Sequence, residues 1–228
     1  MKPYTYLFVN IACILIPLIA SFYKKYPFQK EWKHFLPANI IIAILFLIWD
    51  AWFTKIGIWG FNTDYLTGIY LYNLPLEEIL FFICIPYSCV FTYFVCKKYI
   101  PNKLFSFPSL VIHFFLIVLC VVAIVMYNEK MYTLWTSTAL LFSLIFVWIK
   151  KINIRIMIVS YIMIFPFFLL SNGILTGSII DKPIVWYNNM ENIGVRMFTI
   201  PIEDSFYGFL LILLNILLYE YLKKEKIF

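Results

Sequence analysis

The sequence predicts an all-α integral membrane protein of about seven transmembrane helices, and its composition, apolar runs and loop charges all support this class. Hydrophobic residues make up 64% of the 228 residues and charged residues only 13%. Soluble domains are usually about 45–50% apolar and about 25% charged. The apolar residues fall in runs of roughly 17 to 25, long enough for a helix to cross a hydrocarbon core of about 30 Å. We therefore expect the bilayer to be the main solvent.

The apolar runs give the order of the helices along the chain. The first run begins close to Met1, but no small-residue cleavage site follows it, so we expect a retained helix rather than a signal peptide. All five cysteines lie inside the runs, with no C-x-x-C pair, which favours small core residues over disulfides or a metal site. The predicted helices are residues 4–22, 35–53, 74–96, 109–127, 134–149, 154–170 and 198–222.

The charges of the loops predict how these helices are oriented. Short cytoplasmic loops collect Lys and Arg, and here 13 of the 18 cationic residues follow helices one, three, five and seven. We therefore expect a multi-pass protein of the cell (plasma) membrane, with the N-terminus outside and the C-terminus in the cytoplasm. The cations are spread over several loops, so contact with anionic lipid explains them better than nucleic-acid binding does. They are Lys24, Lys25, Lys30, Lys33, Lys97, Lys98, Lys103, Lys150, Lys151, Arg155, Lys223, Lys224 and Lys226.

An internal repeat relates the two halves of the chain. A shift of 126 residues aligns residues 58–82 with residues 184–208 without a gap, including an Asn, a Gly and a Pro-x-acid-acid motif in both copies. The same shift carries helices one, two and three onto helices five, six and seven. Three is an odd number, so a linking helix is needed to make the two units parallel. We expect one membrane domain, with unit one at about 1–96, a linking helix at about 109–127 and unit two at about 130–228.

Each unit places two adjacent acids at the start of its third helix. One acid there has an ordinary explanation, because the exposed N–H groups and the helix dipole favour negative charge by about 0.3–1 kcal/mol. We expect Asn73 and Thr199 to cap these helices, each followed by a proline in the first turn. Two acids are harder to explain, because adjacent helical residues diverge by about 100° and at least one should face the bundle interior. Asp50, beside Trp49 and Trp52, is either a fifth polar group at this level or a solvated helix end.

An aromatic membrane pocket with carboxylic acids suits one kind of chemistry. Burial favours the neutral acid, which can protonate a carbon–carbon double bond of an apolar polyene. Aromatic faces then stabilise the carbocation, and a carboxylate removes a different proton. Besides the rings named below, Trp52, Trp59 and Phe206 are candidates for this stabilisation.

At these residues the chain resembles the membrane-embedded lycopene cyclases of carotenoid biosynthesis, here as a fusion of two small subunits. The resemblance runs through segments 50–54, 57–62, 74–78, 81–82 and 86–87, and in the second half through 186–189, 192–196 and 200–204. It implies a redox-neutral isomerase (intramolecular lyase) that closes the linear ends of lycopene into β-ionone rings. It implies no cofactor and no metal. Its expected partners are lycopene, membrane lipid and other carotenoid enzymes.

The resemblance also implies roles for particular residues. Its acid motif carries over to the two acidic pairs, and we expect Glu77→Gln or Glu203→Gln to abolish cyclisation. Asp50, Asn62 and Arg196 match further polar positions of the family, and we expect nearby rings to support the cation. The candidate catalytic residues are Glu77, Glu78, Glu203 and Asp204, and the supporting residues are Asp50, Asn62, Arg196, Phe81, Phe82 and Tyr207.

Other functions remain open at this point. Intramembrane acids in repeated helical units also mark proton-coupled transporters, although few Gly or Pro breaks occur at mid-depth here apart from Pro86 and Pro166. No G-x-G-x-x-G motif follows a strand pattern, and no strand pattern is seen, which excludes a flavin-binding cyclase. Within the cyclase class, an ε-ring product or a C50 substrate is an alternative. The sequence does not assign the acid and the base.

Overall fold

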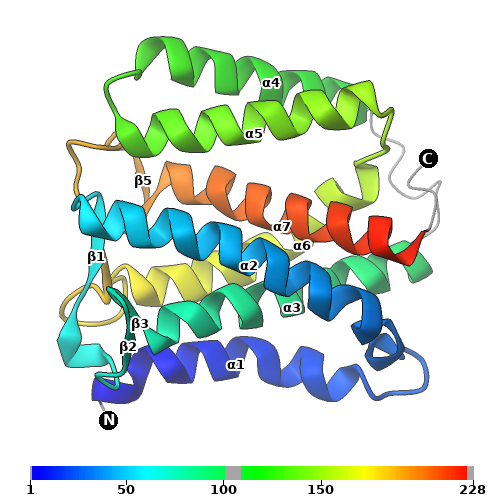
Figure 1. The fold of residues 1–228 in the computed structure, drawn as a ribbon, viewed down its shortest axis with the longest axis horizontal. Helices are drawn as coiled ribbons and strands as arrows, with labels where there is room; N and C mark the ends of the chain where they lie inside the picture. Colours follow the sequence, from blue (N-terminus) through cyan, green and yellow to red (C-terminus); the bar gives the residue numbers. More distant parts are fainter. Residues whose placement is uncertain (1, 101–108, 225–228) are drawn as a thin grey trace.

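The chain folds into a bundle of helices that agrees with the predicted class. The computed structural model describes residues 2–100 and 109–224, and seven helices within them are long and apolar enough to cross a membrane. They lie side by side, with the short strands gathered near the N-terminus at one end of the bundle (Figure 1). The helices are α1 (Thr5–Ala20), α2 (Trp32–Lys55), α3 (Leu76–Tyr99), α4 (Ser109–Met126), α5 (Met131–Ile149), α6 (Arg155–Leu175) and α7 (Ile202–Lys223).

Short strands and 3₁₀ turns connect the helices. The strands were not predicted, because the sequence shows no strand pattern. These strands have only two or three residues, too few for an alternating pattern to be visible. They form three antiparallel pairs, β1 with β4, β2 with β3 and β5 with β6. The elements are η1 (Lys2–Tyr4), η2 (Phe28–Glu31), η3 (Thr63–Tyr65), β1 (Trp59–Phe61), β2 (Tyr70–Leu71), β3 (Leu74–Pro75), β4 (Val185–Tyr187), β5 (Arg196–Met197) and β6 (Ile200–Pro201).

The predicted N-caps of α3 and α7 are wrong. Pro75 and Pro201 occupy the cap positions, in extended conformation and without a capping side chain. The residues before each proline form a tight hairpin, which places Asn73 and Thr199 in its turn, away from the free N–H groups of the helix. Asn73 Nδ2 instead donates to the carbonyl of Ala51 at 2.8 Å.

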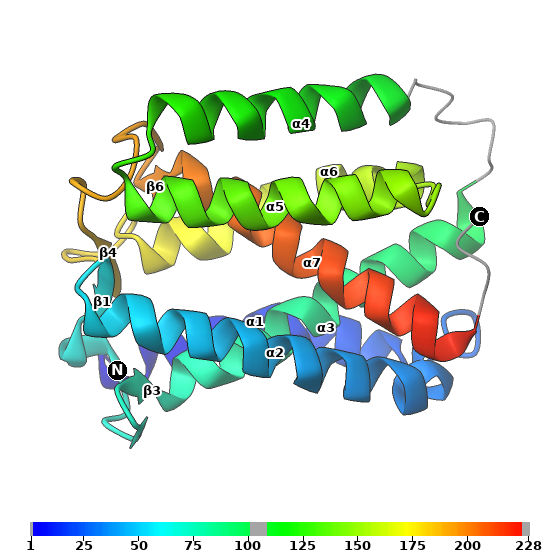
Figure 2. The same ribbon diagram turned by 45° about the horizontal axis from the view of Figure 1, so that its top comes forward.

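The repeat is visible in the geometry. The shift of 126 residues carries β1, β2 and β3 onto β4, β5 and β6, and the first residues of α1 and α3 onto those of α5 and α7. It also carries individual hydrogen bonds: Leu76 N donates to Ile69 O at 2.9 Å, and Ile202 N donates to Val195 O at 3.0 Å. The fold is therefore two parallel three-helix repeats, and α4 links them at the edge of the bundle, against α5 (Figure 2).

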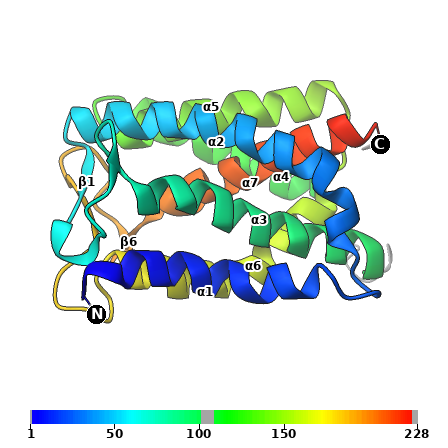
Figure 3. The same cartoon turned by 60° about the horizontal axis from the view of Figure 1, so that its bottom comes forward.

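The two repeats exchange helix contacts and meet on one strand pair. Helix α2 has its largest contact with α7 of the other repeat, and α6 has its largest contact with α3, so α3 and α7 lie centrally (Figure 3). Between β1 and β4, Gly60 lies opposite Trp186, its own counterpart in the repeat. The flanking bonds are reciprocal, because Asn62 N donates to Ile184 O and Asn188 N donates to Ile58 O, both at 2.8 Å. A local two-fold axis therefore passes through this strand pair.

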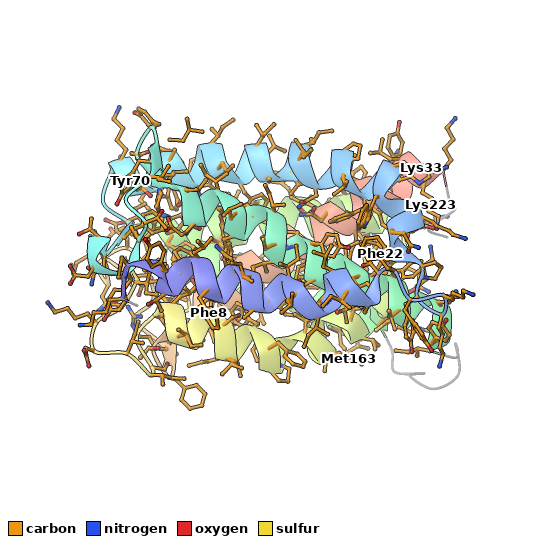
Figure 4. The ribbon with its side chains drawn as sticks, turned by 90° about the horizontal axis from the view of Figure 1, so that it is seen from below. Phe8, Phe22, Lys33, Tyr70, Met163 and Lys223 are labelled. Atoms are coloured by element: carbon orange, nitrogen blue, oxygen red, sulfur yellow. The ribbon has the colours of Figure 1, made fainter. Side chains whose placement is uncertain are left out.

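The two ends of the bundle differ in charge. Tyr70 marks the end with the strands, called the strand end below, while Lys33 and Lys223 lie at the opposite end (Figure 4). Two ion pairs secure the opposite end: Lys97 lies 2.8 Å from the buried Glu220, and Lys223 lies 3.0 Å from Glu31. This separation agrees with the predicted sidedness of the cations, of which Lys103 and Lys226 lie outside the described residues.

Candidate active site

A cavity of about 530 Å³ lies between the two repeats. Its walls are mostly apolar and aromatic, and its carboxyl groups are Asp50, Glu78 and Asp204. Trp59 and Tyr187, from the β1–β4 pair, line it at the strand end. Cavities of roughly 300–1,000 Å³ with apolar walls and a few polar groups are typical of binding sites for small molecules.

Glu78 and Asp204 occupy equivalent positions and have equivalent partners. The Tyr6 hydroxyl donates to Glu78 Oε2 at 2.5 Å, and the Tyr132 hydroxyl donates to Asp204 Oδ1 at 2.6 Å. Tyr6 and Tyr132 are themselves 126 residues apart, near the starts of α1 and α5. Each acid is thus held by the first helix of its own repeat.

The two acids nevertheless differ in their other partners. Asp204 Oδ2 also accepts hydrogen bonds from the Tyr187 hydroxyl at 2.9 Å and from Asn172 Nδ2 at 3.1 Å. Burial raises the pKa of the Tyr187 phenol well above its usual value, and the charge of Asp204 raises it further, so this group remains a donor. The repeat counterparts of Tyr187 and Asn172 are Phe61 and Phe46, which have no polar group to offer Glu78.

Glu77 and Glu203, the first acid of each pair, do not line this cavity. Glu77 Oε1 accepts from the backbone N–H of Thr67 at 2.6 Å, and Glu203 Oε1 accepts from that of Ile193 at 2.7 Å. Glu203 also accepts from the Thr133 hydroxyl at 2.7 Å and borders a separate pocket of only about 30 Å³. These side chains therefore hold the loop ahead of their own helix, ten residues upstream in both copies.

Asp50 is a buried acid of the cavity rather than a solvated helix end. Its side chain lines the cavity and is 1% exposed. Asp50 Oδ1 accepts from Trp59 Nε1 and, at 3.5 Å, from the Thr54 hydroxyl. Asp50 Oδ2 has no hydrogen-bond partner within the described residues. The repeat counterpart of Asp50 is Thr176, so this acid is present in one copy only.

Two of the expected supporting residues lie outside the cavity. Asn62 Oδ1 accepts from the N–H of Asp64 at 3.1 Å and thereby caps η3. The Arg196 guanidinium donates to the Thr199 carbonyl at 2.5 Å and lies 6.0 Å from the centre of the Tyr187 ring. Arg196 therefore lies outside the cavity, next to Tyr187 of its lining.

The expected aromatic residues lie partly in the cavity. Phe81, Phe82, Tyr207 and Trp59 line it, whereas Trp52 does not, and Phe206 borders the smaller pocket. The Tyr207 hydroxyl is buried and has no hydrogen-bond partner among the residues that the structure describes. The rings therefore lie next to the acids, as a site for a cationic intermediate requires.

Comparison with known proteins identifies the group to which this architecture belongs. The family model described as lycopene cyclase matches residues 3–96 and residues 129–222, most of the chain. The chain belongs to the lycopene cyclase family. The two matched segments are themselves offset by 126 residues, the shift that relates the two repeats of this lycopene cyclase family member.

The curated relatives of this lycopene cyclase family member are much longer proteins. Two, each described as a bifunctional lycopene cyclase/phytoene synthase, come from Arthroderma gypseum and Neurospora crassa. The first is 31% identical over 41% of this chain and 16% of its own length. The second is 27% identical over 44% of this chain and 17% of its own length. The chain thus spans about a sixth of the length of these relatives, and no solved structure matches it.

Four polar residues of the site were not predicted from the sequence: Tyr6, Tyr132, Tyr187 and Asn172. A signal for two of them exists, because Tyr6 and Tyr132 are identical residues at the repeat offset, outside the segment where the repeat is strongest. Tyr187 and Asn172 have phenylalanine counterparts. Their role therefore depends on a fold in which β4 and α6 approach the start of α7.

Proposed function

We propose that the protein is a lycopene β-cyclase, an isomerase that closes the linear ends of lycopene into β-ionone rings within the bilayer. The observation that carries this proposal is the aromatic cavity that Glu78, Asp204 and Asp50 all line. Membership of the lycopene cyclase family supports the substrate class. The curated relatives carry a lycopene cyclase name, although they are much longer.

The proposed reaction is an isomerisation in which every proton is accounted for. A carboxylic acid adds a proton to the terminal double bond of the polyene and leaves a cation on the neighbouring carbon. The next double bond attacks this cation, forming the ring bond and moving the charge into the ring. A carboxylate then removes a proton from an adjacent ring carbon, which restores a double bond. One proton enters and one leaves, so no oxidant or reductant is required.

The different surroundings of the acids suggest a division of labour. Asp50 and Glu78 both line this cavity, and two carboxyl groups in one apolar site resist double ionisation. This pair therefore holds the proton that Glu78 delivers. Asp204 accepts three hydrogen bonds, which stabilise a carboxylate. Asp204 is accordingly the base.

The remaining candidates support this geometry. Glu77 and Glu203 act as positioning residues, since each fixes the loop ahead of its helix. Phe81, Phe82 and Tyr207 lie where their faces can stabilise the cation, an interaction worth about 2 kcal/mol in a desolvated site. Arg196 supports the orientation of Tyr187 from outside the cavity.

The same proposal includes the boundaries of the units and the orientation in the membrane. Unit one covers about 1–96, α4 is the link and unit two covers about 130–228.

The strand end faces the outside of the cell membrane, because the lysines collect at the other end. A reporter that fluoresces only in the cytoplasm should therefore fluoresce when fused to the C-terminus and stay dark on the β4–β5 loop. The reverse pattern would overturn the orientation.

Pigment analysis tests the activity directly. Cells that accumulate lycopene should form monocyclic and then bicyclic carotenoid when they express the chain, and chromatography against standards identifies the ring type. Unchanged lycopene with the intact protein in the membrane would contradict the cyclase proposal and favour a transport or binding function. ε-ring products would keep the cyclase function but show that the base removes a proton from a different ring carbon. Conversion of a C50 substrate alone would change the substrate assignment.

A further inference from the structure

The cavity reaches the lipid-facing surface of the bundle between α1 and α6. Three of its lining residues are also exposed on the outside of the bundle: Ile16 of α1 at 75%, and Phe167 and Leu170 of α6 at 72% and 58%. Ala12 of α1 lines the cavity and is exposed as well. Helices α1 and α6 run next to one another on the face seen in Figure 4. The cavity therefore has a mouth on the side of the bundle.

This mouth begins near the acids and extends away from them along the bundle axis: Leu170 is two residues before Asn172, which binds Asp204, while Ile16 lies toward the other end. Tyr6, which binds Glu78, precedes Ile16 by ten residues on α1, a rise of roughly 15 Å at 1.5 Å per residue. The cavity continues along α3 from Glu78 to Thr92, a rise of roughly 21 Å. Trp59 and Tyr187 line its strand end, next to the acids. The cavity is thus a long channel with the acids at one end and a side opening toward hydrocarbon.

The repeat predicts a second, equivalent mouth between α5 and α2, but aromatic rings occupy that region. The repeat counterpart of Val9, a cavity residue of α1, is Trp135 of α5, whose ring meets that of Trp52 edge-on with centroids 5.0 Å apart. The ring of Trp49 packs against Tyr207 with centroids 5.2 Å apart. The two seams are therefore equivalent in topology but not in packing.

We propose that the carotenoid enters sideways from the bilayer through the mouth between α1 and α6, one end at a time, while the rest of its chain stays in the lipid. This inference rests on the proposed function and adds the route of the substrate. Both ends of lycopene are reactive, yet the channel leads from one mouth to one set of acids. A chain threaded through the mouth presents one end to Glu78 and Asp204 and must leave and turn round before the second end reacts. Monocyclic carotenoid is therefore a released intermediate.

Blocking the mouth after the protein has folded tests this route. Ala12→Cys places a thiol in the mouth, and Leu15→Cys places one on the same helix, exposed to lipid but outside the cavity lining. Cys13 and Cys89 also line the cavity, so both variants and their parent chain carry alanine at these two positions. The three proteins are reconstituted in lycopene-containing vesicles and treated with a bulky apolar maleimide. Each is compared with its own untreated sample. We expect treated Ala12→Cys to lose cyclisation at least about tenfold, since an added ring overfills a packed passage, and treated Leu15→Cys to match the treated parent chain.

The outcomes separate the route from the reaction. Equal activity of treated Ala12→Cys and treated Leu15→Cys, with labelling of both confirmed by mass, would overturn the side entry. So would a bicyclic product that forms without any monocyclic carotenoid at early times in an excess of lycopene. Failure of the untreated wild type to cyclise lycopene would instead remove the proposed function itself. Misfolding does not explain a loss that appears only on labelling.

Discussion

At the scale of single residues, adjacent acids in one helical turn are assigned different tasks. Glu78 lines the cavity, whereas Glu77 binds the N–H of Thr67. We expect Glu78→Gln to lower cyclisation by about 10² to 10⁴, the usual contribution of a general acid. The measurement is the amount of cyclic carotenoid per amount of inserted protein. Asp204→Asn should cause a loss of the same order, because the amide cannot accept the final proton.

The neighbouring acid provides the matched comparison. Glu77→Gln keeps a carbonyl oxygen that accepts the N–H of Thr67. We therefore expect cyclisation activity to fall by less than about tenfold, because one hydrogen bond is weakened by about 1 kcal/mol. Glu203→Gln should behave in the same way, since Glu203 holds Ile193. If Glu77→Gln and Glu203→Gln both abolished cyclisation while Glu78→Gln stayed active, the roles assigned to the two acids of each pair would be reversed. This result would also restore the expectation drawn from the sequence alone.

The sequence predicted the acids but not their orientation. The repeat and the cost of burying charge identified both acidic pairs, because each pair lies in a short motif of consecutive residues. Which acid of a pair faces the cavity depends on the phase of the helix, which the hairpin before each proline sets. The tyrosine partners lie 72 residues away in sequence, so no local pattern connects them with the acids.

At the scale of the elements, the β1–β4 pair joins the two repeats through backbone hydrogen bonds. A Cβ added to Gly60 would meet ring atoms of Trp186 at 2.4 and 2.7 Å. We expect Gly60→Ala to destabilise the protein by about 1–3 kcal/mol, the usual cost of overpacking. Thermal unfolding in detergent should show this as a lower midpoint. The same change displaces the strands next to Trp59 and Tyr187, so activity should fall as well.

A second glycine serves as the control for this prediction. At Gly208 of α7 the nearest atom to an added Cβ is a Phe168 ring carbon at 3.5 Å, an ordinary contact. Gly208→Ala should therefore leave the unfolding midpoint unchanged or raise it, because Ala favours a helix by up to about 1 kcal/mol over Gly. Equal midpoints for the two alanine variants would show that the strand pair tolerates the extra atom and that its packing was misjudged.

The helices were predicted more completely than the elements between them. Long apolar runs gave all seven. The largest differences are at the end of α6, placed at 170 instead of Leu175, and at the start of α7, placed at 198 instead of Ile202 because the residues before Pro201 form a strand. Apolar length determines a membrane span almost alone. The strand pairs depend on contacts between distant segments, such as Gly60 with Trp186, and leave no periodic pattern.

At the scale of the whole molecule, the two repeats form one site that neither forms alone. Glu78 and Tyr6 come from the first repeat, and Asp204 and Tyr132 come from the second. The first repeat alone therefore provides the proposed proton donor without the proposed base. Conversely, the second repeat alone lacks Asp50, since Thr176 occupies the equivalent position.

Cutting the chain between α3 and α4 tests this dependence. Each fragment expressed alone should leave lycopene unchanged, because the cavity then loses half of its walls. The two fragments expressed together should restore cyclic carotenoid, because α2 packs on α7 and α6 packs on α3 without any need for the link. Replacing the second fragment by its Asp204→Asn form should remove the restored activity while the fragments still copurify. Cyclisation by the first fragment alone would mean that Asp50 and Glu78 supply both acid and base, and that the second repeat only encloses the substrate.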